Sequence, residues 1–250
     1  MKARISFKNK IFKVDLDNPL DISIAFDAAS SLSAYGCGPV EISPVVSGKF
    51  KGDVKQGGSV NFKDIRFNPH GNGTHTECVG HITREAQSVN QSFSKHFFFA
   101  LLITVKPDLM ANGDRVILPA AFKELFMANE GIEAVIVRTI PNKKDKLAAN
   151  YAGSNPPYFH HEVLSYLAAA GVNHFLTDLP SVDRESDGGM LLAHKAFWGL
   201  PDRCAENKTI TELIFVPDSV ADGFYLLNLQ TAPFENDATP SRPTLYHIEF

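Results

Sequence analysis

The sequence predicts a layered α/β protein, and three features of the chain support this prediction. Two continuous apolar runs, residues 97–105 and 134–139, have the length and the aromatic and β-branched content of strands buried on both faces. Between residues 161 and 170 apolar side chains recur at helical spacing, and Gly171 follows as a C-terminal cap. A short apolar segment, residues 172–176, comes next. A helix, a glycine and a strand in this order are typical of a helix packed on a sheet.

The N-terminal part of the chain predicts short strands and irregular loops. Residues 4–15 alternate apolar and polar side chains around Asn9, which predicts a hairpin at the edge of a sheet. Residues 21–24 have the character of the start of another strand. Residues 28–58 are rich in serine, glycine and proline, so we expect irregular loops with short strands there.

Helices and strands alternate in the C-terminal part of the chain. Leu118 and Pro119 open a segment with helical spacing that reaches about Asn129. The charged stretch of residues 142–155 predicts a solvated loop rather than a basic binding patch. The other predicted elements are a helix over 191–198, a loop over 201–208 and strands over 209–216, 223–229 and 244–250. The sequence has no internal repeat and no linker, so we expect one domain over residues 1–250.

Composition and charge argue against several classes of function. The chain has 250 residues, a formal net charge of -4 and a pI near 6.1, so it lacks the basic surface of a nucleic-acid-binding protein. Its three cysteines, Cys37, Cys78 and Cys204, form no CxxC pair, which argues against a disulfide framework. The longest apolar run, residues 97–105, is far shorter than a membrane span, and the first eight residues lack the apolar core of a signal peptide. We therefore expect a cytoplasmic protein that acts on a small molecule, without nucleic-acid or membrane partners.

Three histidines, one glutamate and three glycines gather within residues 68–82. The threonines beside His75 suit a short extended segment, and in such a segment His75 and Glu77 point to the same face. His81 follows four residues after Glu77. An imidazole beside a carboxylate is a ligand set that suits zinc or manganese. The stretch therefore predicts a metal site, and the alternative is a polar surface loop.

A metal site needs further ligands from elsewhere in the chain. His194 follows a predicted strand end and a polar loop, and strand ends in α/β proteins are where ligands collect. Glu212 lies in an otherwise apolar strand, where a carboxylate is either exposed to solvent or paired with a positive group. The other histidines are weaker candidates, namely the helix-start pair His160 and His161, and His96, His174 and His247 in or beside strands.

The chain resembles the cyclase-like metal-dependent hydrolases, whose best-described members are bacterial kynurenine formamidases. Residues 73–81, GTHTECVGH, are similar to part of the family's HxGTHxDxPxH signature. Further landmarks occur in the family's order: DIS at 21–23, TDLPSVD at 177–183, His194, Glu212 and DATPSR at 237–242. Each landmark is short, but together they span most of the chain.

The resemblance implies a fold, an assembly and a site. The implied fold is the swivelling β/β/α type, with a mixed central sheet or barrel flanked by helices, and the implied assembly is a homodimer or a higher homo-oligomer. The implied cofactor is one or two divalent ions, zinc before manganese. The implied metal ligands are His70 and His75 on one ion, Glu77 as the bridging carboxylate, His194 on the other ion and Glu212 shared by both. His81 would be the catalytic proton donor and acceptor.

The chain departs from the family pattern at several positions. Glu77 stands where the family has Asp, and the spacing that follows His70 is one residue longer. Val79 replaces a proline, and residues 201–208 lengthen the interval between the later histidine and glutamate. Leu20 stands where the formamidases have a substrate-contacting Trp, which argues against an aromatic formamide as the substrate.

These observations predict a metal-dependent hydrolase that cleaves a C–N bond of an amide, a formamide or a lactam. One alternative is the same scaffold with lactone or ester hydrolysis, or with dehydratase chemistry. Another is a catalytically inactive protein that binds a metal ion or a small acid.

Overall fold

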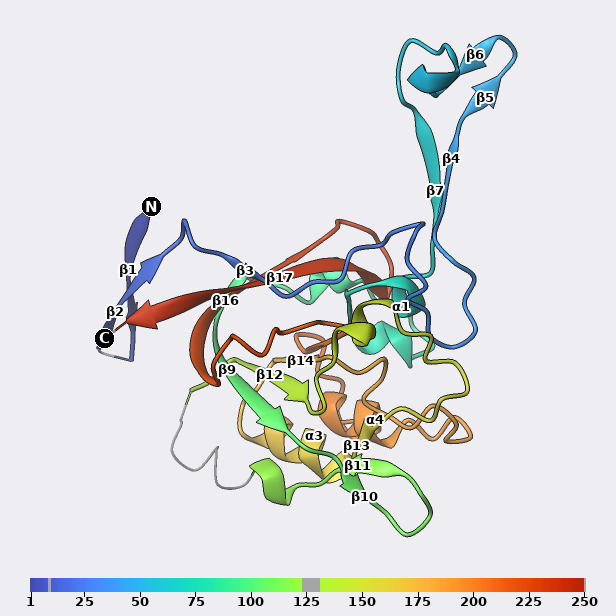
Figure 1. Ribbon diagram of the computed structural model, residues 1–250. Helices are drawn as coiled ribbons and strands as arrows, with labels where there is room; N and C mark the ends of the chain where they lie inside the picture. Colours follow the sequence, from blue (N-terminus) through green and yellow to red (C-terminus); the bar gives the residue numbers. More distant parts are fainter. Residues whose placement is uncertain (9, 123–130, 250) are drawn as a thin grey trace.

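The structure is a computed structural model that describes residues 1–8, 10–122 and 131–249 (Figure 1). At its centre seven strands form a closed, mixed barrel in the order β17, β16, β9, β12, β14, β15, β8, and β17 pairs with β8 to close it. These strands are β8 (His75–Glu77), β9 (Phe97–Val105), β12 (Ala134–Thr139), β14 (His174–Thr177), β15 (Thr209–Glu212), β16 (Gly223–Thr231) and β17 (Ala238–Glu249). The strands β9, β12, β14 and β15 are parallel, and the other neighbours are antiparallel. The predicted fold class, a mixed barrel with flanking helices, is confirmed.

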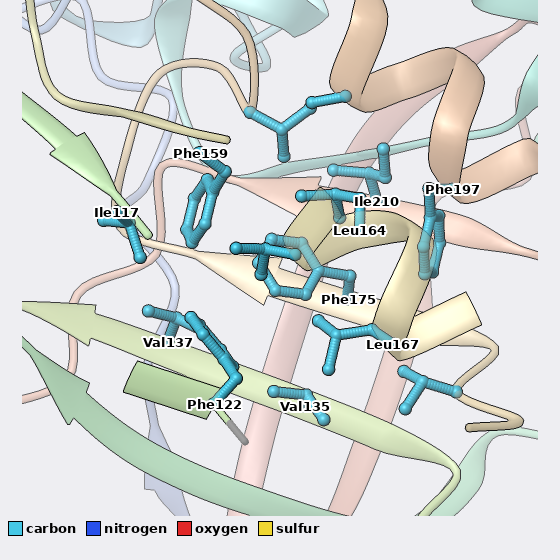
Figure 2. Packing of buried hydrophobic residues seen from close by; sticks show 14 of the residues in the cluster. Ile117, Phe122, Val135, Val137, Phe159, Leu164, Leu167, Phe175, Phe197 and Ile210 are labelled. Carbon is cyan, nitrogen blue, oxygen red and sulfur yellow. The ribbon is translucent and has the colours of Figure 1, made fainter. Parts of the chain in front are cut away.

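The two apolar runs are strands buried on both faces, as their composition predicts. In β12 the side chains of Ala134 and Ile136 belong to one core, together with residues of β9, β16 and β17. Val135 and Val137 belong to a second core, which lies between the barrel and the helices α3 (His161–Ala169) and α4 (Leu192–Trp198). Figure 2 shows Val135 and Val137 in that second core with Leu167 of α3 and Phe197 of α4. Side chains alternate between the two cores because the strand period is two.

Most predicted elements are present, with shifted ends. Gly171 has a φ of 89°, the left-handed conformation expected of a glycine directly after a helix. The predicted strand at 209–216 ends at Glu212, because Leu213 has a φ of 55° and turns the chain out of the strand. The strand predicted from 244 already begins at Ala238, where it pairs with β8. The predicted helix at 118–129 is helical at 120–122, and its remaining residues lie outside the described part.

The N-terminal hairpin lies beside the barrel. Its strands β1 (Lys2–Phe7) and β2 (Lys10–Asp15) pair with each other, and β2 pairs with β17, so β1 is an edge strand as predicted. The next strand, β3 (Leu20–Asp21), ends three residues before the predicted end at 24, and the Ile24 N–H donates to the Thr74 hydroxyl at 2.6 Å instead of to a neighbouring strand.

A two-stranded ribbon, which we call the arm (residues 41–66), projects away from the barrel (Figure 1). Its stalk pairs β4 (Glu41–Pro44) with β7 (Lys63–Arg66), and its tip holds β5 (Val46–Ser47), β6 (Phe50–Lys51) and the 3-10 helix η1 (Val54–Gln56). The region predicted as irregular loops with short strands, residues 28–58, therefore includes most of this ordered two-stranded arm. The remaining elements are α1 (Pro69–Asn72), the 3-10 helices η2 (Val79–His81), η3 (Val89–Gln91) and η4 (Lys144–Ala148), and a small sheet of β10 (Asp108–Leu109), β11 (Arg115–Ile117) and β13 (Tyr158–Phe159).

Candidate metal centre

The closure of the barrel creates the site. The short strand β8 lies between β15 and β17, and its register places His75 opposite Glu212 and Glu77 opposite Ala238. His75 Nε2 lies 3.5 Å from Glu212 Oε2. Because side chains alternate along β8, His75 and Glu77 point to the same face, as the sequence predicts. Both side chains are fully buried.

Glu77 is at the centre of the cluster, in contact with three imidazoles. Its Oε1 atom lies 3.0 Å from His194 Nε2. Its Oε2 atom lies 3.2 Å from His70 Nδ1 and 3.8 Å from His81 Nε2. One carboxylate therefore connects residues of α1 and η2, which flank β8 in the sequence, with a residue of the distant helix α4.

Two aspartates orient the histidines. Asp183 Oδ2 lies 2.6 Å from His194 Nδ1, and the same carboxylate accepts the backbone N–H groups of Ala193 and His194 at the start of α4. Asp237 Oδ2 lies 3.1 Å from His70 Nε2 and 3.3 Å from His81 Nδ1. Histidine ligands of metal ions usually have a carboxylate partner of this kind on the second ring nitrogen.

Two further hydrogen bonds hold the loop that follows β14. The Val182 N–H donates to Glu212 Oε1 at 3.0 Å, and the Tyr35 hydroxyl donates to the Pro180 carbonyl at 2.6 Å. Tyr35 has a φ of 57°, a conformation that is unusual for a bulky residue. The loop therefore fixes the Glu212 carboxylate, and Tyr35 ties a distant N-terminal segment to that loop.

Two buried polar atoms at the centre lack a hydrogen-bond partner among the described residues, namely His75 Nε2 and Glu77 Oε2. An unsatisfied buried polar atom is costly and uncommon in folded proteins, and coordination of an ion satisfies such an atom. Two sets of side chains bring ligand atoms within 4.8 Å of one another: His70, Glu77 and His81, and His75, Glu77 and Glu212. Glu77 is the residue that belongs to both sets. Nitrogen and carboxylate donors in this number fit a divalent ion such as zinc or manganese.

The sequence model of the Cyclase family, described as "Putative cyclase", matches residues 14–184, which is more than half of the chain. The chain belongs to the Cyclase family. A comparison with curated proteins finds no match.

Several solved structures share the architecture of this Cyclase-family chain. A potential metal-dependent hydrolase with cyclase activity is 16% identical, with a TM-score of 0.65 over 92% of this chain and 97% of the other. A predicted metal-dependent hydrolase from Bacillus stearothermophilus is 16% identical, with a TM-score of 0.62 over 92% and 98%. Isatin hydrolase A from Labrenzia aggregata is 14% identical, with a TM-score of 0.65 over 93% and 94%. At these identities the likeness establishes the fold.

Burial and neighbouring charges oppose each other in the titration of this Cyclase-family site. Burial lowers the pKa of His70, but its hydrogen bond to Asp237 and its contact with Glu77 outweigh burial and raise that pKa to about 10. Burial likewise opposes a charge on His194, but Glu77 and Asp183 raise its pKa to about 10. Burial raises the pKa of Glu77, yet the charges of His81 and His194 hold it well below its usual range. The metal-free site is thus a network of paired charges.

The structure brings all six residues proposed from the sequence into one cluster, namely His70, His75, Glu77, His81, His194 and Glu212. Their individual roles stay predictions. Sequence reasoning assigned no role to Asp183, Asp237 or Tyr35. The signal for the two aspartates was their place in the TDLPSVD and DATPSR stretches, whereas Tyr35 had none.

The weaker histidine candidates lie elsewhere. His160 and His161 form a separate group with Glu162 at the start of α3. His174 is buried against Phe93 and Phe98, and its Nδ1 lies 2.9 Å from the Thr209 hydroxyl. None of the helices within residues 1–8, 10–122 and 131–249 has the length and apolarity needed to cross a membrane.

Proposed function

We propose that this chain is a metal-dependent hydrolase that cleaves a C–N bond of an amide, a formamide or a lactam. The observation that carries the proposal is a pair of buried atoms, His75 Nε2 and Glu77 Oε2, that form no hydrogen bond among the described residues although imidazoles and carboxylates surround them. Structural neighbours described as metal-dependent hydrolases and isatin hydrolases support it. Isatin is a cyclic amide, so these neighbours favour amide over ester chemistry.

The proposed ligands are His70, His75, Glu77, His194 and Glu212, with Glu77 in the bridging position. We propose zinc as the first candidate and manganese as the second, for one or two sites in each chain. When bound, a divalent ion acidifies water and polarises a carbonyl oxygen, which is the chemistry that amide hydrolysis needs at neutral pH. Asp183 holds the His194 ring through Nδ1, so that Nε2 faces Glu77.

His81 is the proposed proton donor to the leaving nitrogen. Its Nδ1 lies near Asp237, and its side chain is 30% exposed, against 3% for His194 and none for His75. A cavity of about 430 Å³ is lined by Asp237 and by Gly80, the residue before His81, and its lining includes none of the six cluster residues. Asp237 keeps one ring nitrogen of His81 engaged, so Nε2 is the atom that exchanges a proton with the substrate.

Metal content and turnover, measured on the same preparations, test the proposal. Wild-type protein purified without chelator is compared with His75→Ala and with His160→Ala, which removes a histidine outside the cluster. We expect one or two ions per chain in wild type and in His160→Ala, and a clear loss in His75→Ala that still folds. Saturable, chelator-sensitive turnover is expected on formamides or lactams.

The substrate panel also separates the alternatives. Turnover of lactones without turnover of amides would replace C–N cleavage with ester hydrolysis. A folded protein that takes up neither zinc nor manganese would contradict the metal-dependent hypothesis altogether, as would equal turnover in wild type and His75→Ala.

A further inference from the structure

The loop that follows β14, residues 178–183, contacts two of the proposed metal ligands. The Val182 N–H donates to Glu212 Oε1 at 3.0 Å, and Asp183 Oδ2 lies 2.6 Å from His194 Nδ1. Glu212 lies in β15 and His194 lies in α4, so the loop links side chains from two different elements. A displacement of this loop therefore changes the position of both ligands.

A buried ion pair anchors the start of the loop. The side chain of Asp178 is fully buried, and its Oδ2 atom accepts a hydrogen bond from Lys146 Nζ at 2.7 Å. The same carboxylate accepts the Thr139 N–H at 2.9 Å. Lys146 Nζ also donates to the Thr139 carbonyl at 2.8 Å and to the Asn142 side-chain oxygen at 3.3 Å, so each of its three N–H groups has an acceptor. These contacts fix where Asp178 lies.

Lys146 differs from its neighbours in the charged stretch of residues 142–155. Lys143 and Lys144 are exposed, as a solvated loop requires, whereas the Lys146 side chain is 14% exposed. Burial of an ion pair costs desolvation and the ordering of a long side chain, so such a pair adds little to stability compared with apolar residues of the same volume. The position that the pair imposes on Asp178 is therefore a better explanation for it than stability.

A second contact holds the middle of the same loop, and it comes from a segment that is joined to the Lys146 segment. The Ser33 N–H donates to the Ala149 carbonyl at 3.1 Å, and the Tyr151 N–H donates to the Ser33 carbonyl at 2.8 Å. Two residues after Ser33, the Tyr35 hydroxyl donates to the Pro180 carbonyl at 2.6 Å. The two joined segments thus hold the loop at positions 178 and 180.

The backbone of the loop is held along its length, so it can transmit the position of Asp178 to Val182. The Leu213 N–H donates to the Leu179 carbonyl at 3.1 Å, and the Phe159 N–H donates to the Val182 carbonyl at 2.9 Å. A loop whose backbone groups are bonded in this way has little freedom to absorb a shift at its start.

We propose that Lys146 is a positioning residue of the candidate metal centre, and that it acts on Glu212 and His194 through Asp178 and the loop. The inference rests on the ligand set of the proposed function. The hydrogen bonds of Lys146 end on residues outside that ligand set, so its effect on the centre is indirect. Side chains that hold ligands in place typically contribute about 10- to 100-fold to metal affinity.

Two variants and a matched control test the proposal. Lys146→Met removes the charge and keeps most of the side-chain length, but it leaves a buried carboxylate unpaired and can prevent folding. Lys146→Met with Asp178→Asn removes both charges and avoids that problem. The control is Arg138→Met with Asp222→Asn, because this cation and carboxylate lie 2.9 Å apart and the other hydrogen bonds of Arg138 go to Thr104 and to the carbonyls of residues 217 and 220.

Hydrogen exchange of the Val182 amide, followed by NMR on the metal-free protein, measures how well the loop is held. We expect exchange to be at least about tenfold faster in the Lys146 variants than in wild type, and to stay within about threefold in the control. Circular dichroism and urea unfolding show that the compared proteins are folded and correct the exchange rates for global stability.

Zinc affinity, measured by competition with a chelator, tests the effect on the centre. The zinc Kd should rise by about 10- to 100-fold in the Lys146 variants and stay within about threefold in the control. An unchanged zinc Kd or an unchanged Val182 exchange rate in the folded double variant would overturn the inference, as would an equal change in the control. A wild type that binds zinc without cleaving an amide would contradict the proposed reaction but not this inference, because neither measurement depends on turnover.

Discussion

Metal loading of the centre should release protons. In the metal-free protein the pKa values of His70 and His194 are about 10, so both imidazoles are charged at neutral pH. A metal ion binds the neutral imidazole, and each proton has to leave first. At pH 7 the pKa of each ring lies about three units above the pH, which costs roughly 4 kcal/mol, or about a thousandfold in affinity, for each ligand. Because both pKa values are raised, affinity rises with pH until about pH 10.

Calorimetry counts these protons. Zinc or manganese is titrated into metal-free protein at pH 7 in buffers with different ionisation enthalpies, and the dependence of the heat on the buffer gives the protons released. We expect about two protons per chain when both histidines become ligands. The logarithm of the metal affinity should rise by up to about two per pH unit between pH 6.5 and 9.

Asp237→Asn is the informative comparison for this titration. The substitution removes the charged partner of His70 Nε2, so the pKa of His70 falls and fewer protons leave on binding. Asp237 belongs to neither set of candidate ligands that share Glu77, so the variant should still take up metal. Metal binding without proton release, or an affinity that is the same at pH 6.5 and 8.5, would refute the reasoning.

Three further predictions concern single side chains. His81→Gln should keep the metal content and lower kcat by about 10²- to 10⁴-fold as a lost proton donor; loss of metal as well would make His81 a ligand. Tyr35→Phe removes the hydrogen bond to Pro180, so thermal unfolding should show a loss of about 1 kcal/mol, and an unchanged midpoint would contradict this. Burial, followed by the charges of Lys208 and Lys95, lowers the pKa of His174 to about 3. Below about pH 6.5 the unfolded chain therefore binds a proton at His174, whereas the folded protein keeps this imidazole neutral. Stability should fall by about 1.4 kcal/mol per pH unit in that window, and urea unfolding at pH 7 and pH 5 should show a smaller loss in His174→Gln than in wild type.

The local pattern of apolar and polar residues was enough to predict the strands that are buried on both faces and the faces to which their side chains point. The runs at 97–105 and 134–139 are strands with two covered faces, and continuous apolar sequence is what such strands require. The orientation of His75 and Glu77 followed from the strand period alone. The ends of strands were less predictable, because β15 stops where Leu213 turns toward the loop after β14 and its N–H donates to the Leu179 carbonyl.

The missing parts of the site depend on contacts between distant segments. Asp237 reaches His70 across 167 positions, and this contact exists only because β17 closes the barrel on β8. The residue pattern around Asp237 and the pattern around His70 do not indicate that the two side chains meet. The arm was missed for a different reason. Its strands are two to four residues long and two of them contain serine or proline, so their alternation is too short to separate from a loop.

The register of β8 determines whether the centre forms at all, and the threonines that flank His75 explain how that register is held. A slip by one residue would turn His75 and Glu77 away from Glu212 and present Thr76 in their place. The Thr76 hydroxyl lies 2.7 Å from the Thr211 hydroxyl, which pairs β8 with β15 on the face opposite the proposed metal ligands. The Thr74 hydroxyl bonds the Leu213 carbonyl just beyond the end of β15. Threonine thus alternates with histidine and glutamate so that one face of the strand fixes the register and the other face carries the proposed ligands His75 and Glu77.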